Sequence, residues 1–110
     1  MKIALPVADD KLAMHFGHCE VFAIAEIEDN KVLKIEMLTP PPHEPGVLPA
    51  WLGELKVNVI IAGGMGVRAQ DLFKGQGIDV LVGAPAEDIN ILIEKYLNGS
   101  LETGANVCDH

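Results

Sequence analysis

The stretch NVIIAGGMGVR, residues 58–68, passes from an apolar run through a glycine-rich turn into residues that favour a helix. The run predicts a buried strand over residues 58–62, and the residues after the turn predict a helix over 67–74. A second apolar strand is predicted over 78–82, after the glycines that end this helix. A strand, a helix and a strand in this order form a right-handed crossover between parallel strands. The stretch therefore predicts an α/β fold.

Three further strands are predicted upstream. Residues 2–7 are apolar from Ile3 onward, which is typical of a strand buried on both faces. Residues 21–28 and 31–38 are joined by Asp29-Asn30, a sequence that favours a two-residue hairpin turn. In the second of these strands apolar and charged residues alternate, so we expect it at the edge of the sheet. The simplest arrangement is a five-stranded mixed sheet, order 3-2-1-4-5, with strand 2 antiparallel.

Two more helices complete the expected fold. One is predicted over residues 47–56, with Pro49 near its first turn, and the other over 85–98, opened by Pro85 and ended by Gly99. With helices on both faces, strands 1 and 4 are parallel neighbours whose connections leave in opposite directions. Open α/β sheets bind ligands at such a switch point. The loops over residues 8–19 and 63–68 are expected to converge there.

Composition narrows the possible functions. The 110 residues suit one domain, and 49% hydrophobic with 22% charged residues is a globular composition. The net charge of −8 argues against a nucleic acid or an anionic membrane as partner. The opening residues do not resemble an export signal, and the longest apolar stretch, around residues 59–67, is half of a membrane span. We therefore expect a cytoplasmic protein, in which cysteines are free thiols or metal ligands.

The side chains best able to bind metal gather in two short segments. They are His15, His18 and Cys19 in HFGHC, and Cys108 and His110 in the C-terminal CDH. Imidazole and thiolate suit zinc, copper and iron, and thiolates are the usual ligands of iron–sulfur clusters. The spacing is not that of a zinc finger, and there is no CxxC. The alternative is that Cys19 enters the core at the start of a strand and the histidines are solvated.

The glycine turn could bind an anion. Gly63, Gly64 and Gly66 would let backbone N–H groups approach a ligand, and the following helix adds positive potential at its N-terminus. Arg68, the only arginine in the chain, lies in that first helical turn. The turn is neither a Walker A motif nor a full dinucleotide fingerprint. It is also explained by a tight strand–helix turn that needs glycine for clearance.

Several segments together resemble the dinitrogenase iron–molybdenum cofactor-binding family, the NifX/NafY-type domains. They are His15-Phe16-Gly17 after the opening MKIALPV, then Val21-Phe22-Ala23, IAGGMG at residues 61–66, Ala69, and the glycines and apolar residues between Phe73 and Val80. The resemblance covers about residues 1–100. It implies a ribonuclease H-like motif and the binding or carriage of a metal–sulfur cluster, with His15 of the His-Phe-Gly motif as the best candidate ligand.

Three hypotheses follow. The first is a non-enzymatic protein that binds an anionic Fe–S, Mo–Fe–S or Mo–Cu–S cluster and delivers it to proteins of cofactor assembly. In it, residues 1–99 form the binding domain, residues 100–110 form a Cys/His tail, His15 ligates with Cys19 or His18, and Phe16 and Gly17 complete the motif. The second is a zinc or copper site built from the same side chains. The third is a thiol enzyme with Cys19 activated by a neighbouring histidine.

Overall fold

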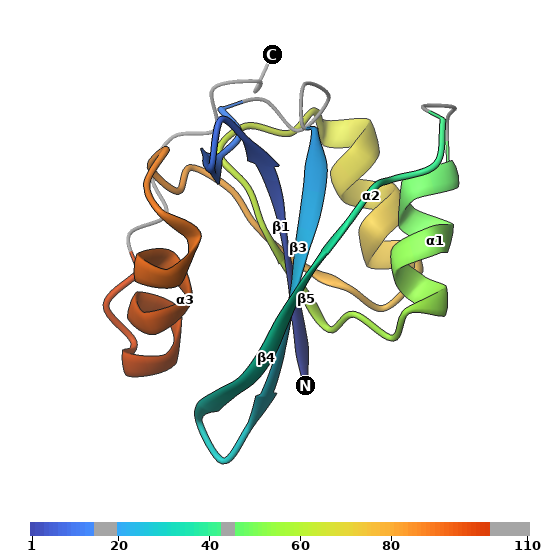
Figure 1. Ribbon diagram of the computed structural model, residues 1–110. Coiled ribbons are helices and arrows are strands. Elements are labelled where there is room, and N and C mark those ends of the chain that lie inside the picture. The colour runs from blue at the N-terminus through green and yellow to red at the C-terminus, as the bar shows by residue number, and fades with distance from the viewer. Residues whose placement is uncertain (15–19, 43–45, 102–110) are drawn as a thin grey trace.

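The computed structural model describes residues 1–14, 20–42 and 46–101 (Figure 1). In chain order the elements are β1 (Lys2–Ala8), β2 (Lys11–Leu12), β3 (Val21–Glu28), β4 (Lys31–Leu38), α1 (Val47–Glu54), β5 (Val59–Ile61), α2 (Val67–Gly75), β6 (Asp79–Leu81) and α3 (Ile89–Asn98). The α/β class predicted from the sequence is confirmed.

The sheet has the strand order that the sequence predicts. Its main path runs β4-β3-β1-β5-β6, in which β3 is antiparallel to both of its neighbours and β1, β5 and β6 are parallel. The hairpin between β3 and β4 turns at Asp29 and Asn30, whose φ angles of 51° and 63° suit a two-residue hairpin loop. This places β4 at one edge of the sheet, as expected.

The prediction of five strands is wrong, because a sixth, β2, pairs antiparallel with the end of β1. The two strands are joined by Asp9 and Asp10, whose φ angles of 53° and 63° lie in the left-handed region. Aspartate tolerates this region better than most residues, but Asp-Asp is a weaker turn signal than Asn-Gly or Asp-Gly. A two-residue strand after such a turn has too little hydrophobic periodicity to be found from sequence.

Helices cover both faces of the sheet (Figure 1). On one face α3 packs against a cluster that includes Leu5, Val7 and Leu92. On the other, α1 and α2 pack against a cluster that includes Phe22, Leu52 and Phe73. Since β1 supplies residues to both clusters, its apolar run from Ile3 to Val7 is explained by burial on both faces.

The last helix begins four residues later than the sequence predicts, at Ile89 instead of Pro85. Asp88 is the N-cap, and its side chain accepts a hydrogen bond from the Asn90 N–H at 2.8 Å. The Glu87 carbonyl accepts a hydrogen bond from the Leu12 N–H at 3.0 Å, so this residue is bound to β2 and does not join the helix. Among the helices in the described ranges, none is long and apolar enough to cross a membrane.

Candidate functional site

The switch point lies where β1 and β5 run side by side. The two strands are parallel, with Ile3 opposite Val59 and Ala4 opposite Ile60. From their carboxyl ends the chain leaves in opposite directions, to β2 and β3 on one side and to α2 on the other (Figure 1). Ligands of open α/β sheets bind at this kind of position.

The two loops meet in direct contact at Gly63. A Cβ atom added to Gly63 would lie 2.9 Å from the carbonyl oxygen of Met14 and 3.0 Å from that of Ala13. Any side chain here would therefore have to displace backbone. The glycine is required for close approach, which brings the loop after β1 against the turn after β5. The predicted convergence of these two loops is confirmed for the residues described.

The turn after β5 is also fixed on its other side. The Gly63 carbonyl accepts a hydrogen bond from the Gly83 N–H at 2.7 Å, and the Ala62 N–H donates to the Leu81 carbonyl at 2.8 Å. Gly63 is therefore held between the β1 loop and the segment that follows β6. These contacts restrain the turn that leads into α2.

The N-terminus of α2 keeps its positive potential. Its N-cap is Gly66, which has no side chain to accept from the first backbone N–H groups, and its first turn contains no acidic residue. A Cβ on Gly66 would meet nothing within 4 Å, so the backbone is open there. Arg68, the second residue of the helix, is exposed. In contrast, the N-terminus of α3 is already capped by the Asp88 carboxylate.

The metal-capable residues predicted from sequence lie outside the described ranges. They are His15, His18, Cys19, Cys108 and His110, together with Phe16 and Gly17 of the His-Phe-Gly motif. Within the three described ranges, no group of three or more potential metal ligands is found. The ligand set therefore stays a prediction.

Both residues that flank the first metal-capable segment are described, and they lie at the carboxyl end of β1. On one side the Met14 carbonyl contacts Gly63. On the other the Glu20 N–H donates to the Val7 carbonyl at 2.7 Å, and the Glu20 carboxylate accepts from the Asp9 N–H at 2.9 Å. Met14 and Glu20, the described residues on either side of positions 15–19, therefore both lie beside the switch point.

A pocket of about 440 Å³ adjoins the end of the sheet at which β1 finishes. Its lining consists of Ala8, Asp9, Lys11, Leu12, Ala13, Met14 and Ala86. The short hairpin of β1 and β2 forms most of this lining, and sequence reasoning missed that hairpin. The only sequence signal for it was Asp9-Asp10, two residues that tolerate positive φ.

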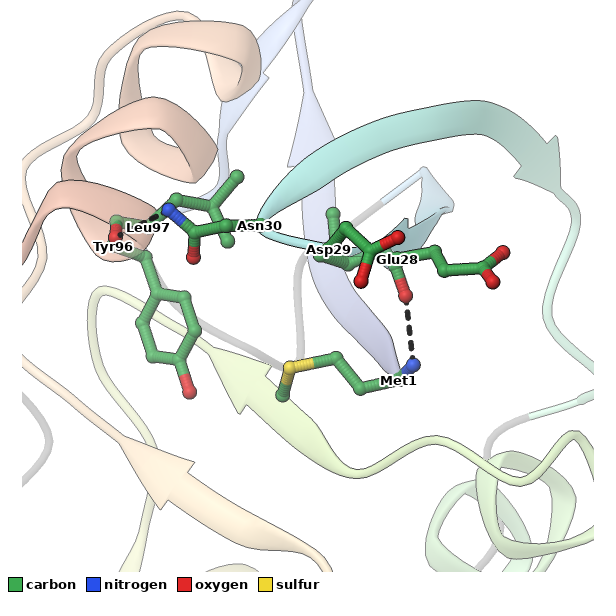
Figure 2. A pocket seen from close by; sticks show the side chains of 7 residues that line it. Met1, Glu28, Asp29, Asn30, Tyr96 and Leu97 are labelled. Atoms are coloured by element: carbon green, nitrogen blue, oxygen red, sulfur yellow. Dashed lines mark hydrogen bonds between the residues drawn. The ribbon is translucent and has the colours of Figure 1, made fainter.

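A larger pocket, of about 550 Å³, lies at the opposite end of the sheet, where β1 begins (Figure 2). The terminal ammonium of Met1 donates to the Ile27 carbonyl at 2.8 Å, and the Asn30 side-chain amide donates to the Leu97 carbonyl at 3.3 Å. These bonds hold β1, the β3–β4 turn and α3 together. The described residues of the candidate site do not line this pocket, so its size does not make it part of that site.

Comparison with known proteins shows what this chain is similar to. A family model described as dinitrogenase iron-molybdenum cofactor matches residues 1–99. The uncharacterized protein MJ0580 of Methanocaldococcus jannaschii is 38% identical over 107 residues, which cover 93% of this chain and 90% of that protein. The family resemblance drawn from the sequence motifs is confirmed.

Solved structures share the fold. The crystal structure of PH0822 superimposes with a TM-score of 0.87 at 29% identity, covering 94% of each chain. The apo form of the orange protein from Desulfovibrio gigas superimposes with a TM-score of 0.75 at 18% identity, covering 96% of this chain and 93% of that one. At that identity, the second likeness concerns the fold alone.

Proposed function

Because this chain belongs to the dinitrogenase iron-molybdenum cofactor family, we propose that it binds an anionic metal–sulfur cluster as cargo and carries it without catalysing a reaction. The cluster is of the Fe–S, Mo–Fe–S or Mo–Cu–S type. His15 is its first ligand, with His18 or Cys19 as a second. The partners are proteins that assemble or receive the cluster.

The contact between Met14 and Gly63 is the observation that carries this proposal. His15 is bonded directly to Met14, whose carbonyl oxygen lies 2.9 Å from where a Cβ of Gly63 would be. Three residues after Gly63, Gly66 caps the open N-terminus of α2. The residue that precedes the family's histidine therefore lies beside the part of the described fold best suited to an anion.

Electrostatics supports a cluster of negative charge. A chain with a net charge of −8 repels anions at long range, so an anionic cargo needs strong local attraction. The first turn of α2 offers it, since it contains Arg68 and no carboxylate. The backbone N–H groups of Gly64 and Gly66 would face the sulfides of the cluster.

Two finer proposals accompany this one. The ribonuclease H-like motif is the fold class that we propose for residues 1–99. The tail over residues 100–110 is proposed to supply Cys108 and His110 as additional ligands from outside that domain. Neither adds an activity, because a shared fold does not imply a shared reaction.

The function is tested by purifying the protein without oxygen and measuring its visible spectrum, metals and acid-labile sulfide. A coloured protein that contains iron or molybdenum together with sulfide is expected. Colourless protein with stoichiometric zinc or copper would replace the proposal with a simple metal site. Metal-free protein with a fast-reacting Cys19 thiol would replace it with a thiol enzyme.

Arg68→Glu is expected to weaken binding of an anionic cluster by about 1–3 kcal/mol, more at low salt than at high salt. The substitution reverses the charge in the first turn of α2, where the helix dipole also favours an anion. A bare zinc or copper ion should instead bind equally well or slightly better. The measurement is a titration of the variant with each metal species at two ionic strengths.

Lys74→Glu is the matched control for that variant. Lys74 is exposed in the last turn of the same helix, so its reversal changes the net charge equally but at the other end of α2. We expect it to leave cluster affinity nearly unchanged. Equal weakening by both variants would show that net charge, and not the N-terminus of α2, controls binding.

A further inference from the structure

The outer edge of β4 ends the sheet. In the strand order β4-β3-β1-β5-β6, β4 has a neighbour on one side only among the described strands. It is eight residues long, which leaves a row of backbone N–H and C=O groups able to pair with another strand. Natural proteins protect such edges or use them for pairing.

The side chains of β4 divide into an apolar row and a charged row. Ile35 and Met37 lie opposite Ala25 and Ala23, which belong to the cluster under α3. Lys34 and Glu36 therefore point to the other face of the sheet. Met37 is 51% exposed, and the nearby Leu33 is 55% exposed. The apolar row is unusually open for a sheet that is otherwise well covered.

The charged row is self-complementary. The Lys34 ammonium lies 3.0 Å from the Glu36 carboxylate and 3.7 Å from that of Glu26. The hydrogen bond and charge of Glu36 are the main causes that raise the pKa of Lys34. A lysine on an edge strand normally opposes pairing with another strand. When two copies of the strand pair about a two-fold axis, however, a glutamate two residues after the lysine in one copy can face the lysine of the other.

We propose that β4 pairs antiparallel with β4 of a second copy of this chain, with Ile35 opposite Ile35 at the two-fold axis. In this register Lys34 of each copy faces Glu36 of the other, which makes two charge-complementary pairs. Ile35 and Met37 of both copies lie on the α3 face, so their apolar side chains meet there. The proposal is independent of cluster binding.

Neighbouring registers that keep the faces matched are unfavourable. Moving the axis to Lys34 would place Lys34 opposite Lys34, and moving it to Glu36 would place Glu36 opposite Glu36. Like charges directly opposite each other destabilise a strand pair.

The length of the pairing between the two β4 strands is also limited. A register shift between β3 and β4 leaves Leu33 as an extra residue at one end, and Pro40 and Pro41 follow the other.

The paired sheets would be continuous, with both copies of α3 on the same face. The two paired β4 strands run in opposite directions. The carboxyl ends of the two β1 strands therefore point to opposite ends of the joint sheet. In each copy β3 separates β1 from β4, so the described residues of the candidate cluster site are not on the paired strand. Loss of the dimer should leave cluster binding unchanged, so failure of one proposal does not imply failure of the other.

The test is the solution mass of the full chain, measured by light scattering from micromolar to millimolar concentration. The mass is expected to rise from 11.8 kDa towards twice that value. Lys34→Glu and Glu36→Lys should each raise the dimer dissociation constant about 10-fold or more, because each puts like charges opposite in both pairs. A mixture of the two variants should form a heterodimer, since glutamates at both positions of one chain face lysines of the other.

The mixing experiment separates pairing from effects within one chain. Each variant also alters the contacts of Lys34 with Glu26 and Glu36, but mixing two chains cannot restore those contacts. Ile91→Lys is a control, because Ile91 is 46% exposed on α3 and is not part of β4, and it should leave the dimer intact. A mass of one chain at every concentration would overturn the proposal. So would a dimer that is insensitive to both charge reversals.

Discussion

Gly63→Ala is expected to lower the free energy of unfolding by about 1–3 kcal/mol. The added methyl group would meet the carbonyl oxygens of Met14 at 2.9 Å and Ala13 at 3.0 Å, which are backbone atoms and cannot rotate away. Either the β1 loop or the turn after β5 must shift. Urea denaturation of the two proteins, followed by circular dichroism, measures the difference.

Gly66→Ala is the control for this substitution, because it makes the same chemical change three residues later. A Cβ on Gly66 would meet nothing within 4 Å, and its φ of −63° and ψ of 153° suit any residue. We expect stability to change little, since alanine restricts the unfolded chain more than glycine does but is a poorer N-cap than glycine. Equal stability of the two variants would mean that the loops do not meet at Gly63.

The same pair of variants bears on the site. Displacing Ala13 and Met14 moves the residue to which His15 is bonded, so Gly63→Ala should weaken cluster binding as well as stability. If affinity stays at the wild-type value while stability falls, the contact at Gly63 supports the fold without positioning the histidine. That result would remove the observation on which the proposed function rests.

The fold could be predicted because its strongest signals are local. Asp29-Asn30 fixes the β3–β4 hairpin, and the glycine turn at residues 63–66 separates β5 from α2. These elements fell within a residue or so of their predicted bounds. The start of α3 did not, because the Glu87 carbonyl bonds to Leu12, a residue 75 positions earlier that no local pattern reveals.

The candidate site was predictable only in part. Glycine-rich turns after strands are visible in sequence, so Gly63 and Gly66 could be named. Their different roles could not, because one meets the backbone of Met14 and the other faces open space. The reason is that a contact between loops depends on how β1 and β5 lie in the sheet, and that arrangement appears only in three dimensions.

His15→Ala is expected to lower cluster affinity by at least about 10-fold while leaving the free energy of unfolding nearly unchanged. Loss of a direct ligand should cost more than the 10–100-fold typical of losing a group that only supports a ligand. Stability should hold because Met14, the residue before His15, is exposed and outside both core clusters, and it meets Gly63 through its backbone carbonyl. Reconstitution of the protein with iron and sulfide under anaerobic conditions, followed by competition with a chelator, measures the affinity.

His43→Ala is the matched control, since it removes an imidazole from the proline-rich segment over residues 39–46, which is not part of the predicted site. It should bind the cluster as the wild type does, and the double variant should behave like His15→Ala alone. Wild-type affinity in His15→Ala would exclude His15 as a ligand and move the assignment to His18 and Cys19. A loss that is equal in both single variants would instead indicate nonspecific metal binding by histidines, because His43 is not among the predicted ligands.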